Sequence, residues 1–409
     1  MGKNILIEAL RNNAKDKKMF YSDAEFITYK TGFPTIDYAM GNKVNVFDAK
    51  GELAESYPAL GITGGCYVTV AGKSGLGKTS LVIQIASNIV RPFDNGFVIH
   101  YDIERSSSQT RCSTLSRFSI NDIREGKYIL RQLDCSLESL KEGISEIYME
   151  KISNPDKYRY NSGKKNEFGD EICPYVPTCM IVDSIASISA EVNPNTKEGR
   201  VKIGEISTQT EVMRLNGEIS RFLKESLEMV KEANIIIFFI NHIKQKPSVG
   251  FPVQADLRYL KQDENLPCGR ALQYYSSLMV RLTAVGSEKY TREDDGFDGY
   301  GVQWQFMKNR TNIDGKIVPL VFAPVTGYDS LRSSFSYAKL MGMIGGNKNG
   351  FYIGSDKDKK FKFSTIHEDF KEDKELYKSL YGAIIPELEK ELSSVKPEEL
   401  EVVDEEMDY

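Results

Sequence analysis

The chain has 409 residues, 41% of them hydrophobic and 27% charged, which is the composition of a folded globular protein. It excludes a collagen-like or largely disordered chain, and no apolar run reaches the roughly 20 residues of a membrane-spanning helix. The N-terminus lacks a secretory pattern, so we expect a soluble intracellular protein with no membrane partner. The net charge of -5 is uneven, because residues 397–409 carry seven acids and no base. The rest is slightly basic and is suited to bind a polyanion through local patches.

The six cysteines are scattered, without a Cys-x-x-Cys pair, and the chain has only three histidines. This spacing indicates neither a disulfide framework nor a zinc site. We expect reduced thiols that serve mainly as small buried groups.

In chain order, the first part begins with apolar residues at helical spacing, which predicts a short helical segment that packs on its own body or on a neighbouring copy. Four apolar runs, rich in β-branched and aromatic residues, come next and are separated by helical stretches. Such runs are typical of strands buried on both faces of a parallel sheet. They cover residues 67–71, 97–102, 179–184 and 234–241.

Three later strands, over 276–285, 301–310 and 318–323, have connections too short for helical crossovers, which predicts an antiparallel meander. Residues 150–177 are rich in Lys, Asn, Gly and Pro, and we expect an exposed insertion there. A polar loop is expected to precede the first parallel strand. A smaller unit begins at about Ser330, with one helix ending near Met343 and a final helix ending near residue 392.

The expected fold is α/β, with a mostly parallel central sheet extended by the meander. We divide the chain into an N-terminal helical oligomerisation segment (1–40), a core (41–329), a small α+β C-terminal domain (330–395) and an acidic tail (396–409). The tail is either a competitor for polyanion-binding patches or a solvated, disordered end.

Residues 72–79 read GKSGLGKT and match the pattern G-x-x-x-x-G-K-[ST] between an expected strand and an expected helix. Glycines here let backbone N–H groups and the helix N-terminus face phosphate oxygens, so we expect an ATP-binding loop. Lys78 is expected to reach the β- and γ-phosphates, and the Thr79 hydroxyl to ligate Mg²⁺. A glycine-rich turn without a nucleotide is the alternative. The candidates are Gly72, Lys73, Ser74, Gly75, Leu76, Gly77, Lys78, Thr79 and Ser80.

Two acids follow expected strands at the edge where parallel sheets bind ligands. Asp183 comes after four apolar residues and is expected to hold the Mg²⁺ water shell beside the loop, although an Asp there can also be a turn former. Glu104 lies two residues past another strand, where a carboxylate can orient the attacking water or accept its proton. Its alternative role is an exposed acid paired with Arg105.

The order of these motifs resembles that of the RecA-type homologous recombinases, most closely the phage UvsX-like proteins, over about residues 31–392. GKSGLGKT resembles the family's phosphate loop, YDIE places Glu104 where the family has its catalytic glutamate, and MIVDSIASI resembles its second nucleotide motif. The resemblance implies a RecA-like ATPase core that uses ATP and Mg²⁺.

FFINHIKQK resembles the family strand that ends in a γ-phosphate sensor, and this places His242 at the sensor position. A polar residue satisfied at a strand end is the alternative. Arg111 stands where family members often have an aromatic that stacks on adenine, and we include it among the nucleotide-binding candidates.

The resemblance also implies two DNA-binding loops, at about 190–205 and 242–270. Arg214 and Arg221 lie seven residues apart on one face of the helix expected to start near Glu205, as do family arginines that face the DNA backbone. Cys268 and Gly269 stand where the family has a glycine pair. Solvated loop charges and snorkelling arginines are the alternatives. The DNA-binding candidates are Arg200, Lys202, Arg214, Arg221, Lys244, Lys246, Arg258, Lys261, Gly269 and Arg270.

Lys308 and Arg310 in FMKNR resemble two family cations that reach the γ-phosphate bound by the adjacent subunit. Such charges would neutralise the transition state, as an arginine finger does. The alternative is a strand whose outward residues happen to be basic.

The function that the resemblance implies is ATP-dependent pairing and strand exchange between single-stranded and homologous duplex DNA, within helical filaments of this chain. A single-strand-binding protein and a recombination mediator are the implied partners, and the bacterial or phage-infected host cytoplasm is the implied location. Two other functions stay open: a hexameric DNA helicase on the same core, and a regulatory filament that binds ATP without hydrolysing it.

Overall fold

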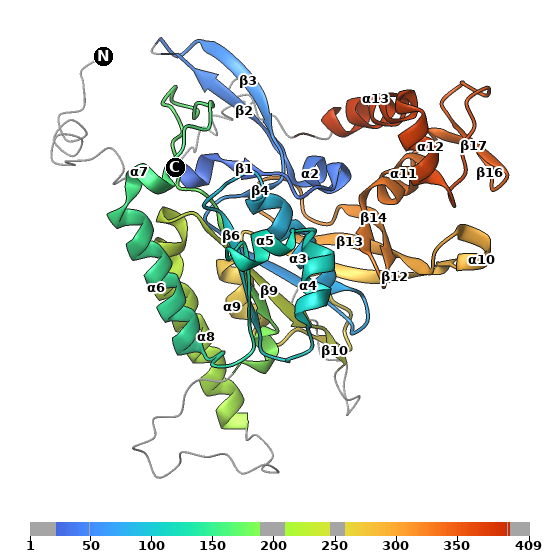
Figure 1. Cartoon of the computed structure of the whole chain (residues 1–409). Coiled ribbons are helices and arrows are strands. Elements are labelled where there is room, and N and C mark those ends of the chain that lie inside the picture. The colour runs from blue at the N-terminus through green and yellow to red at the C-terminus, as the bar shows by residue number, and fades with distance from the viewer. Residues whose placement is uncertain (1–21, 49, 189–208, 246–257, 391, 393–409) are drawn as a thin grey trace, which may run out of the picture.

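The computed structural model describes residues 22–48, 50–188, 209–245, 258–390 and 392, and Figure 1 shows its α/β architecture. The central sheet has nine strands in the order β15-β14-β13-β12-β5-β9-β8-β6-β7. The strands are β5 (Tyr67–Gly72), β6 (Phe97–Asp102), β7 (Tyr128–Arg131), β8 (Thr178–Asp183), β9 (Ile235–His242), β12 (Leu278–Tyr290), β13 (Gly299–Asn309), β14 (Ile317–Ala323) and β15 (Gly327–Asp329).

The predicted sheet is confirmed. Strands β5, β9, β8, β6 and β7 run parallel, and β12 joins them parallel to β5 before the antiparallel meander through β13, β14 and β15 begins. The short edge strands β7 and β15 are additions that the sequence pattern did not predict.

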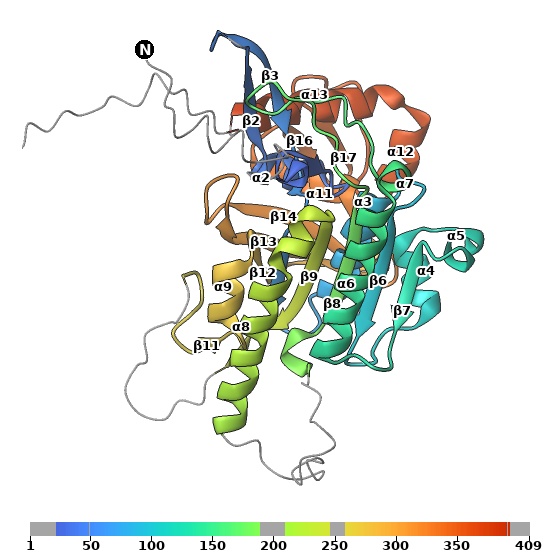
Figure 2. The same ribbon diagram turned by 90° about the vertical axis from the view of Figure 1, so that its left-hand side faces the viewer.

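The sheet separates two hydrophobic cores, and β9 shows why its sequence is apolar without interruption. Ile236, Phe238 and Ile240 belong to one core, whereas Ile237 and Phe239 belong to the other. Helices cover both faces (Figures 1 and 2). They are α3 (Lys78–Val90), α4 (Gln109–Ser116) and α5 (Ile120–Arg124) on one side, and α6 (Leu137–Ser153), α8 (Gln209–Glu232) and α9 (Gly269–Tyr275) on the other.

The short elements before β5 connect the N-terminal part of the described chain to the sheet. They are a 3-10 helix (Asp23–Phe26), β1 (Thr28–Tyr29), α2 (Pro34–Met40), β2 (Asn42–Phe47), β3 (Leu53–Ala59) and β4 (Ile62–Thr63). The expectation of a polar loop before β5 is wrong in part, because β2 and β3 form an antiparallel hairpin that projects from the body (Figure 2). The helix expected in the first residues lies outside the described residues.

The expectation of an exposed insertion over 150–177 is wrong in part. Its first residues complete α6, the short helix α7 (Pro155–Tyr158) follows, and Ile172 and Val176 are buried. The segment also contacts the β2–β3 hairpin, since Tyr57 Oη donates to the Lys165 carbonyl at 2.7 Å. Apolar residues inside a polar stretch therefore cover part of the core.

The C-terminal part packs around a third hydrophobic cluster, which includes Phe335, Phe351, Phe361 and Phe370. Its first helix ends at Leu340, slightly before the expected end. Its elements are α11 (Ser330–Leu340), β16 (Ile344–Asn347), β17 (Gly350–Ile353), α12 (Ile366–Glu372) and α13 (Lys374–Lys390). The division into domains stays a prediction, and the acidic tail lies outside the described residues.

Four small elements remain. A 3-10 helix (Ile185–Ser187) follows β8, β10 (Lys244–Gln245) pairs with β11 (Glu264–Asn265), and α10 (Arg292–Asp295) lies between β12 and β13. Among the helices that the structure describes, none combines the length and the apolar character needed to cross a membrane. All six cysteines are free, and three of them are buried.

Candidate functional site

The register of the parallel strands brings together residues that are far apart in the sequence. Gly72, where the glycine-rich loop begins, lies level with His242 at the end of β9. Asp102 at the end of β6 lies level with Asp183 at the end of β8. Because all these strands end at the same edge of the sheet, the candidates from four motifs meet there.

The loop over residues 72–79 has the backbone that its glycines predict. Gly75 and Gly77 have φ angles of +82° and +66°, a region that favours glycine, and Gly77 directly precedes α3. The N–H groups of the first turn of α3 have no partners within the helix, which suits a helix N-terminus to anions.

Aromatic residues from the meander brace this loop, and sequence reasoning missed them. Tyr328 Oη donates to the Leu76 carbonyl at 2.6 Å, and Tyr300 Oη donates to the Gly75 carbonyl. The Phe322 ring packs against Gly77, where a Cβ would lie 2.4 Å from the ring. Of the three aromatic residues, only Phe322 lies in an expected strand (318–323), and no local signal indicated that the two tyrosines would reach the loop.

Lys78 is a buried cation inside the loop. Its Nζ donates to the Lys73 carbonyl at 2.9 Å and lies 3.4 Å from Nδ1 of His242. Burial lowers the pKa of the ammonium to about 8, although Asp183 and Glu104 act to raise it. A cation held in a loop of backbone N–H groups fits the phosphates of a nucleotide.

Thr79 and Asp183 form the part of the site that fits Mg²⁺. The Thr79 hydroxyl donates to Oδ2 of Asp183 at 2.6 Å. Burial raises the pKa of the Asp183 carboxyl to about 6, and the hydrogen bond from Thr79 opposes this rise. A hydroxyl and a buried carboxylate are oxygen donors of the kind that Mg²⁺ takes beside nucleotide phosphates, so these residues would hold it.

Glu104 lies beside the same edge of the sheet, and three side chains contact its Oε1. Ser184 Oγ donates at 2.5 Å, Ser187 Oγ donates at 3.2 Å, and His242 Nε2 lies at 3.2 Å. Burial acts to raise the pKa of the carboxyl, but the two serines and His242 outweigh it, and the pKa is lowered. The alternative pairing with Arg105 is not seen, because Arg105 donates to the Gln132 carbonyl.

His242 therefore lies between Lys78, which the resemblance assigns to phosphate binding, and Glu104, which it assigns to activation of water. One ring nitrogen faces Lys78 and the other faces Glu104. Burial and the neighbouring Lys78 lower the pKa of the imidazole despite the Glu104 charge.

Arg111, in the first turn of α4, reaches the start of α3. Its guanidinium donates to Ser80 Oγ at 3.2 Å and to the Val325 carbonyl. The arginine thus lies beside α3, next to the candidate nucleotide-binding residues.

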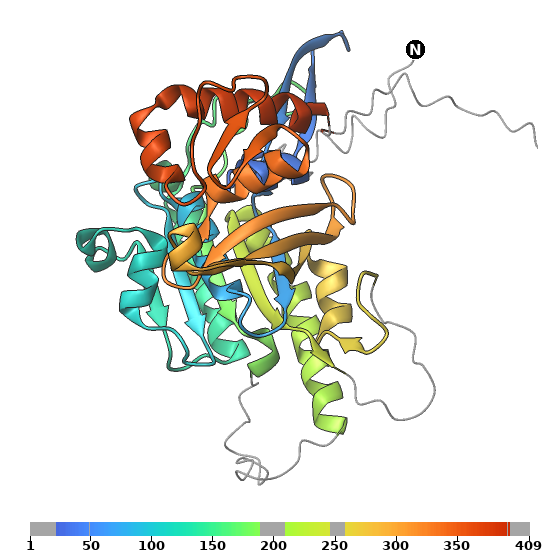
Figure 3. The same ribbon diagram turned by 90° about the vertical axis from the view of Figure 1, so that its right-hand side faces the viewer.

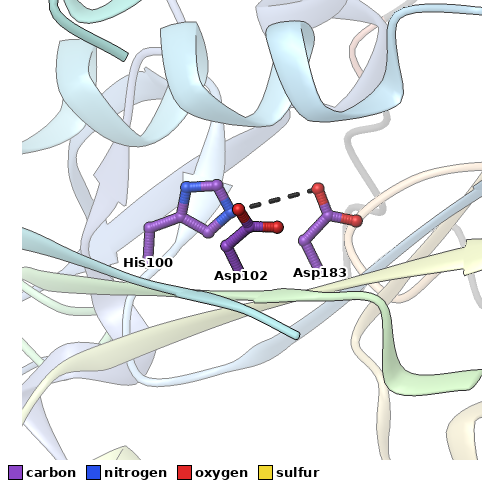
Figure 4. A group of neighbouring side chains, drawn as sticks. All are labelled: His100, Asp102 and Asp183. Carbon is purple, nitrogen blue, oxygen red and sulfur yellow. Dashed lines mark ion pairs between the residues drawn. The ribbon is translucent and has the colours of Figure 1, made fainter. Parts of the chain in front are cut away.

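A buried His-Asp-Asp cluster adjoins the site, and sequence reasoning missed it (Figure 4). His100 and Asp102 are two residues apart on β6 and so share one face of the sheet, which they share with Asp183. Burial lowers the pKa of His100 to about 4, which Asp102 opposes. The alternation of polar residues in HYD was the only signal in the sequence.

Lys308 and Arg310 do not join this site. The register aligns Lys308 with Met279 and, through it, with Thr69, three residues before Gly72. Lys308 donates to the Gln273 carbonyl, and Arg310 to the Tyr274 carbonyl at 3.1 Å. Both cations cap the C-terminus of α9, where positive charge is favourable.

The candidate DNA-binding residues that the structure describes lie near α8, α9 and the β10–β11 pair. The start of α8 and the β10–β11 pair lie at the same end of the molecule (Figures 1 and 3). Lys244, Lys261, Arg214, Arg221, Arg258 and Arg270 are exposed, whereas Gly269 is buried at the start of α9.

Arg221 lies 3.8 Å from Glu218, and Arg258 lies over the Tyr259 ring. Arg200, Lys202 and Lys246 lie outside the described residues, as do the whole first expected loop and residues 246–257 of the second.

Comparison of the sequence with known proteins finds distant relatives named RecA. The RecA protein of Mycoplasma mobile is 22% identical over 394 residues, which are 95% of this chain and 97% of that protein. RecA of Teredinibacter turnerae is 24% identical over 76% of this chain and 78% of that protein, and RecA of Chlamydia trachomatis is 23% identical over 65% and 56%. No protein-family model matches the chain. These similarities support the RecA-type recombinase family and do not favour a helicase or a non-hydrolysing filament.

Proposed function

We propose that this chain is a DNA-dependent ATPase that assembles into helical filaments on single-stranded DNA and catalyses homologous pairing and strand exchange. Within the recombinases we propose a UvsX-like protein, served by a single-strand-binding protein and a mediator. The proposal rests on the position of His242, whose ring lies between Lys78 and Glu104. At this edge of the sheet the phosphate loop meets the segment that leads to the second expected DNA-binding loop.

The chain's own residues suggest how hydrolysis proceeds. Bound MgATP would supply the phosphoryl group and the charge that the loop and Lys78 are shaped to hold. Glu104 Oε1 is taken by Ser184, Ser187 and His242, whereas Oε2 has no hydrogen-bond partner among the described residues. We therefore assign to Oε2 the orientation of water and the acceptance of its proton.

His242 is suited to couple the nucleotide to DNA. It ends β9, and β10 follows after one residue. A γ-phosphate near Lys78 would compete for the imidazole and pull it away from Glu104. That shift would move the end of β9 and, with it, the segment that leads into the second expected loop. The DNA-binding state would then depend on ATP, as in a two-state switch.

The distance of Lys308 and Arg310 from the loop of their own chain supports a role in trans. In a head-to-tail filament, cations beside α9 of one copy would meet the nucleotide of the next, so hydrolysis would require assembly. Burial, together with the neighbouring Arg310, lowers the pKa of Lys308 to about 8, so it is still mainly a cation at neutral pH.

The first test is ATP hydrolysis with and without single-stranded DNA, over a series of salt concentrations. We expect stimulation that falls steeply with salt, because contacts to the phosphate backbone release counterions. Glu104→Gln should lower the rate at least about 100-fold and leave nucleotide binding intact. Glu372→Gln, which changes an exposed acid on α12, is the matched control. Hydrolysis indifferent to DNA would refute the coupling, and turnover that survives in Glu104→Gln would refute the role of Glu104.

The in-trans role has its own test, which mixes two inactive proteins. Lys78→Ala removes the loop cation, and Arg310→Ala removes the cation offered to a neighbour. In a mixed filament, some interfaces pair the intact loop of an Arg310→Ala copy with the intact Arg310 of a Lys78→Ala copy. These interfaces carry neither defect and should recover part of the activity. Mixtures as inactive as their components would contradict the proposal.

A further inference from the structure

The buried cluster behind the phosphate loop contains an imidazole nitrogen without a partner. His100 is fully buried on β6, and its Nδ1 lies 2.9 Å from Tyr128 Oη. Its Nε2 has no hydrogen-bond partner among the residues that the structure describes. Leaving a buried polar atom unpaired is costly, so such an atom calls for an explanation.

Two buried carboxylates face this nitrogen. Asp183 Oδ2 lies 3.9 Å from His100 Nε2, too far for a hydrogen bond, and Figure 4 shows the ring edge directed toward Asp102 and Asp183. One ligand atom from each of the three side chains lies within 4.8 Å of the others. One imidazole and two carboxylates with donor atoms this close together are a set of ligands that can bind a cation.

The surroundings hold these donors in place. Asp102 accepts hydrogen bonds from the Ser106 and Ser107 backbone N–H groups at 3.1 and 2.8 Å, and from Gln132 Nε2 at 2.7 Å. When His100 donates its Nδ1–H to Tyr128, the Nε2 lone pair faces the carboxylates. Histidines that bind metals usually donate their other N–H to an oxygen in this way.

We propose that His100, Asp102 and Asp183 bind a divalent transition-metal ion such as Zn²⁺, at a site distinct from that expected for Mg²⁺ beside Thr79. The imidazole nitrogen favours such an ion over Mg²⁺ and Ca²⁺, which prefer oxygen ligands only. Bonds of about 2.0–2.2 Å place tetrahedral ligands about 3.4 Å apart. The ligand atoms lie within 4.8 Å of one another, so they move together by up to about 1.4 Å on binding.

The shared carboxylate links this site to the nucleotide. Asp183 also accepts the Thr79 hydroxyl, so a metal ion at the His100 side changes the position and charge of the group that faces Mg²⁺. Binding of the metal ion and of MgATP is therefore coupled, and each changes the affinity of the other by the same factor.

The test uses the full chain without an affinity tag, nucleotide or DNA, dialysed against buffered Zn²⁺ in excess Mg²⁺. The wild type should bind about one Zn²⁺ per chain, and His100→Phe should bind it at least about 10-fold more weakly. His367→Phe is the matched control, because His367 is half exposed on α12 and contacts Asp329 instead. Equal Zn²⁺ binding by all three proteins, or no binding by any, would overturn the proposal.

A second measurement needs no variant and covers the case in which His100→Phe fails to fold. The X-ray absorption spectrum of Zn²⁺ bound to the wild type should show nitrogen and oxygen ligands with one imidazole. Sulfur ligands would assign the ion to the free cysteines and refute the site. Both measurements are made without ATP and DNA, so their failure leaves the proposed function untouched.

Discussion

The burial of Lys151 allows a quantitative prediction. Its side chain carries a titratable amine and is buried in the folded protein. It lies in the last turn of α6, and its Nζ donates to the Val176 carbonyl at 2.7 Å and to the Ala233 carbonyl at 2.8 Å. The amine thus connects Val176, in the segment after α7, to Ala233, which directly follows α8. Burial lowers its pKa from 10.5 to about 7, with Cys179 acting in the opposite direction.

The direction of the pH effect follows from these two pKa values. Between about pH 7 and 10.5 the unfolded chain binds a proton that the folded chain lacks, so stability rises with pH by about 1.4 kcal/mol per unit. Below about pH 7 both states are protonated and this contribution is constant. From pH 7.5 to 9.5 the wild type should gain about 2–3 kcal/mol relative to a variant without the amine.

The variant is Lys151→Met, which keeps the length of the side chain and removes its charge. At about pH 9 it should be less stable than the wild type by about 1–3 kcal/mol or more, because two buried carbonyls lose their donor. Urea unfolding of both proteins across this pH range measures the difference, and Lys157→Met, at a half-exposed site on α7, is the control. Parallel pH profiles of the wild type and Lys151→Met would refute the buried neutral amine.

Two further predictions concern the nucleotide site. Gly77→Ala should destabilise the protein by about 2–4 kcal/mol, since the residue needs a positive φ and its Cβ would strike Phe322. Gly75→Ala, with a similar φ but open space, should cost about 1–2 kcal/mol, and equal losses in thermal unfolding would contradict this account. Because the pKa of Asp183 is about 6, Mg²⁺-dependent binding of an ATP analogue should weaken about tenfold per pH unit below pH 6. Asp183→Asn should remove this part of the pH dependence of binding. If the variant binds the analogue with the same pH dependence as the wild type, titration of Asp183 is not its cause.

Much of the core and of the site could be predicted from sequence, because the relevant signals are local. An apolar run such as 234–241 is buried on both faces whichever strands lie beside it. The phosphate loop is encoded within eight consecutive residues, and Asp183 and Glu104 are marked by their positions at strand ends. Parallel strands share one carboxyl edge, so these motifs could be expected to meet before their order in the sheet was known.

Other features depend on which distant elements become neighbours, and only the tertiary structure decided them. Tyr328 reaches the loop across 252 residues of sequence, and Lys151 is buried within a stretch whose composition indicates a surface. His100 is one polar residue in an apolar strand until the register of β6 and β8 sets it beside Asp183. Local patterns record the preferences of the backbone and of burial. The partner of a side chain is chosen by packing and strand register between remote segments, which no local pattern contains.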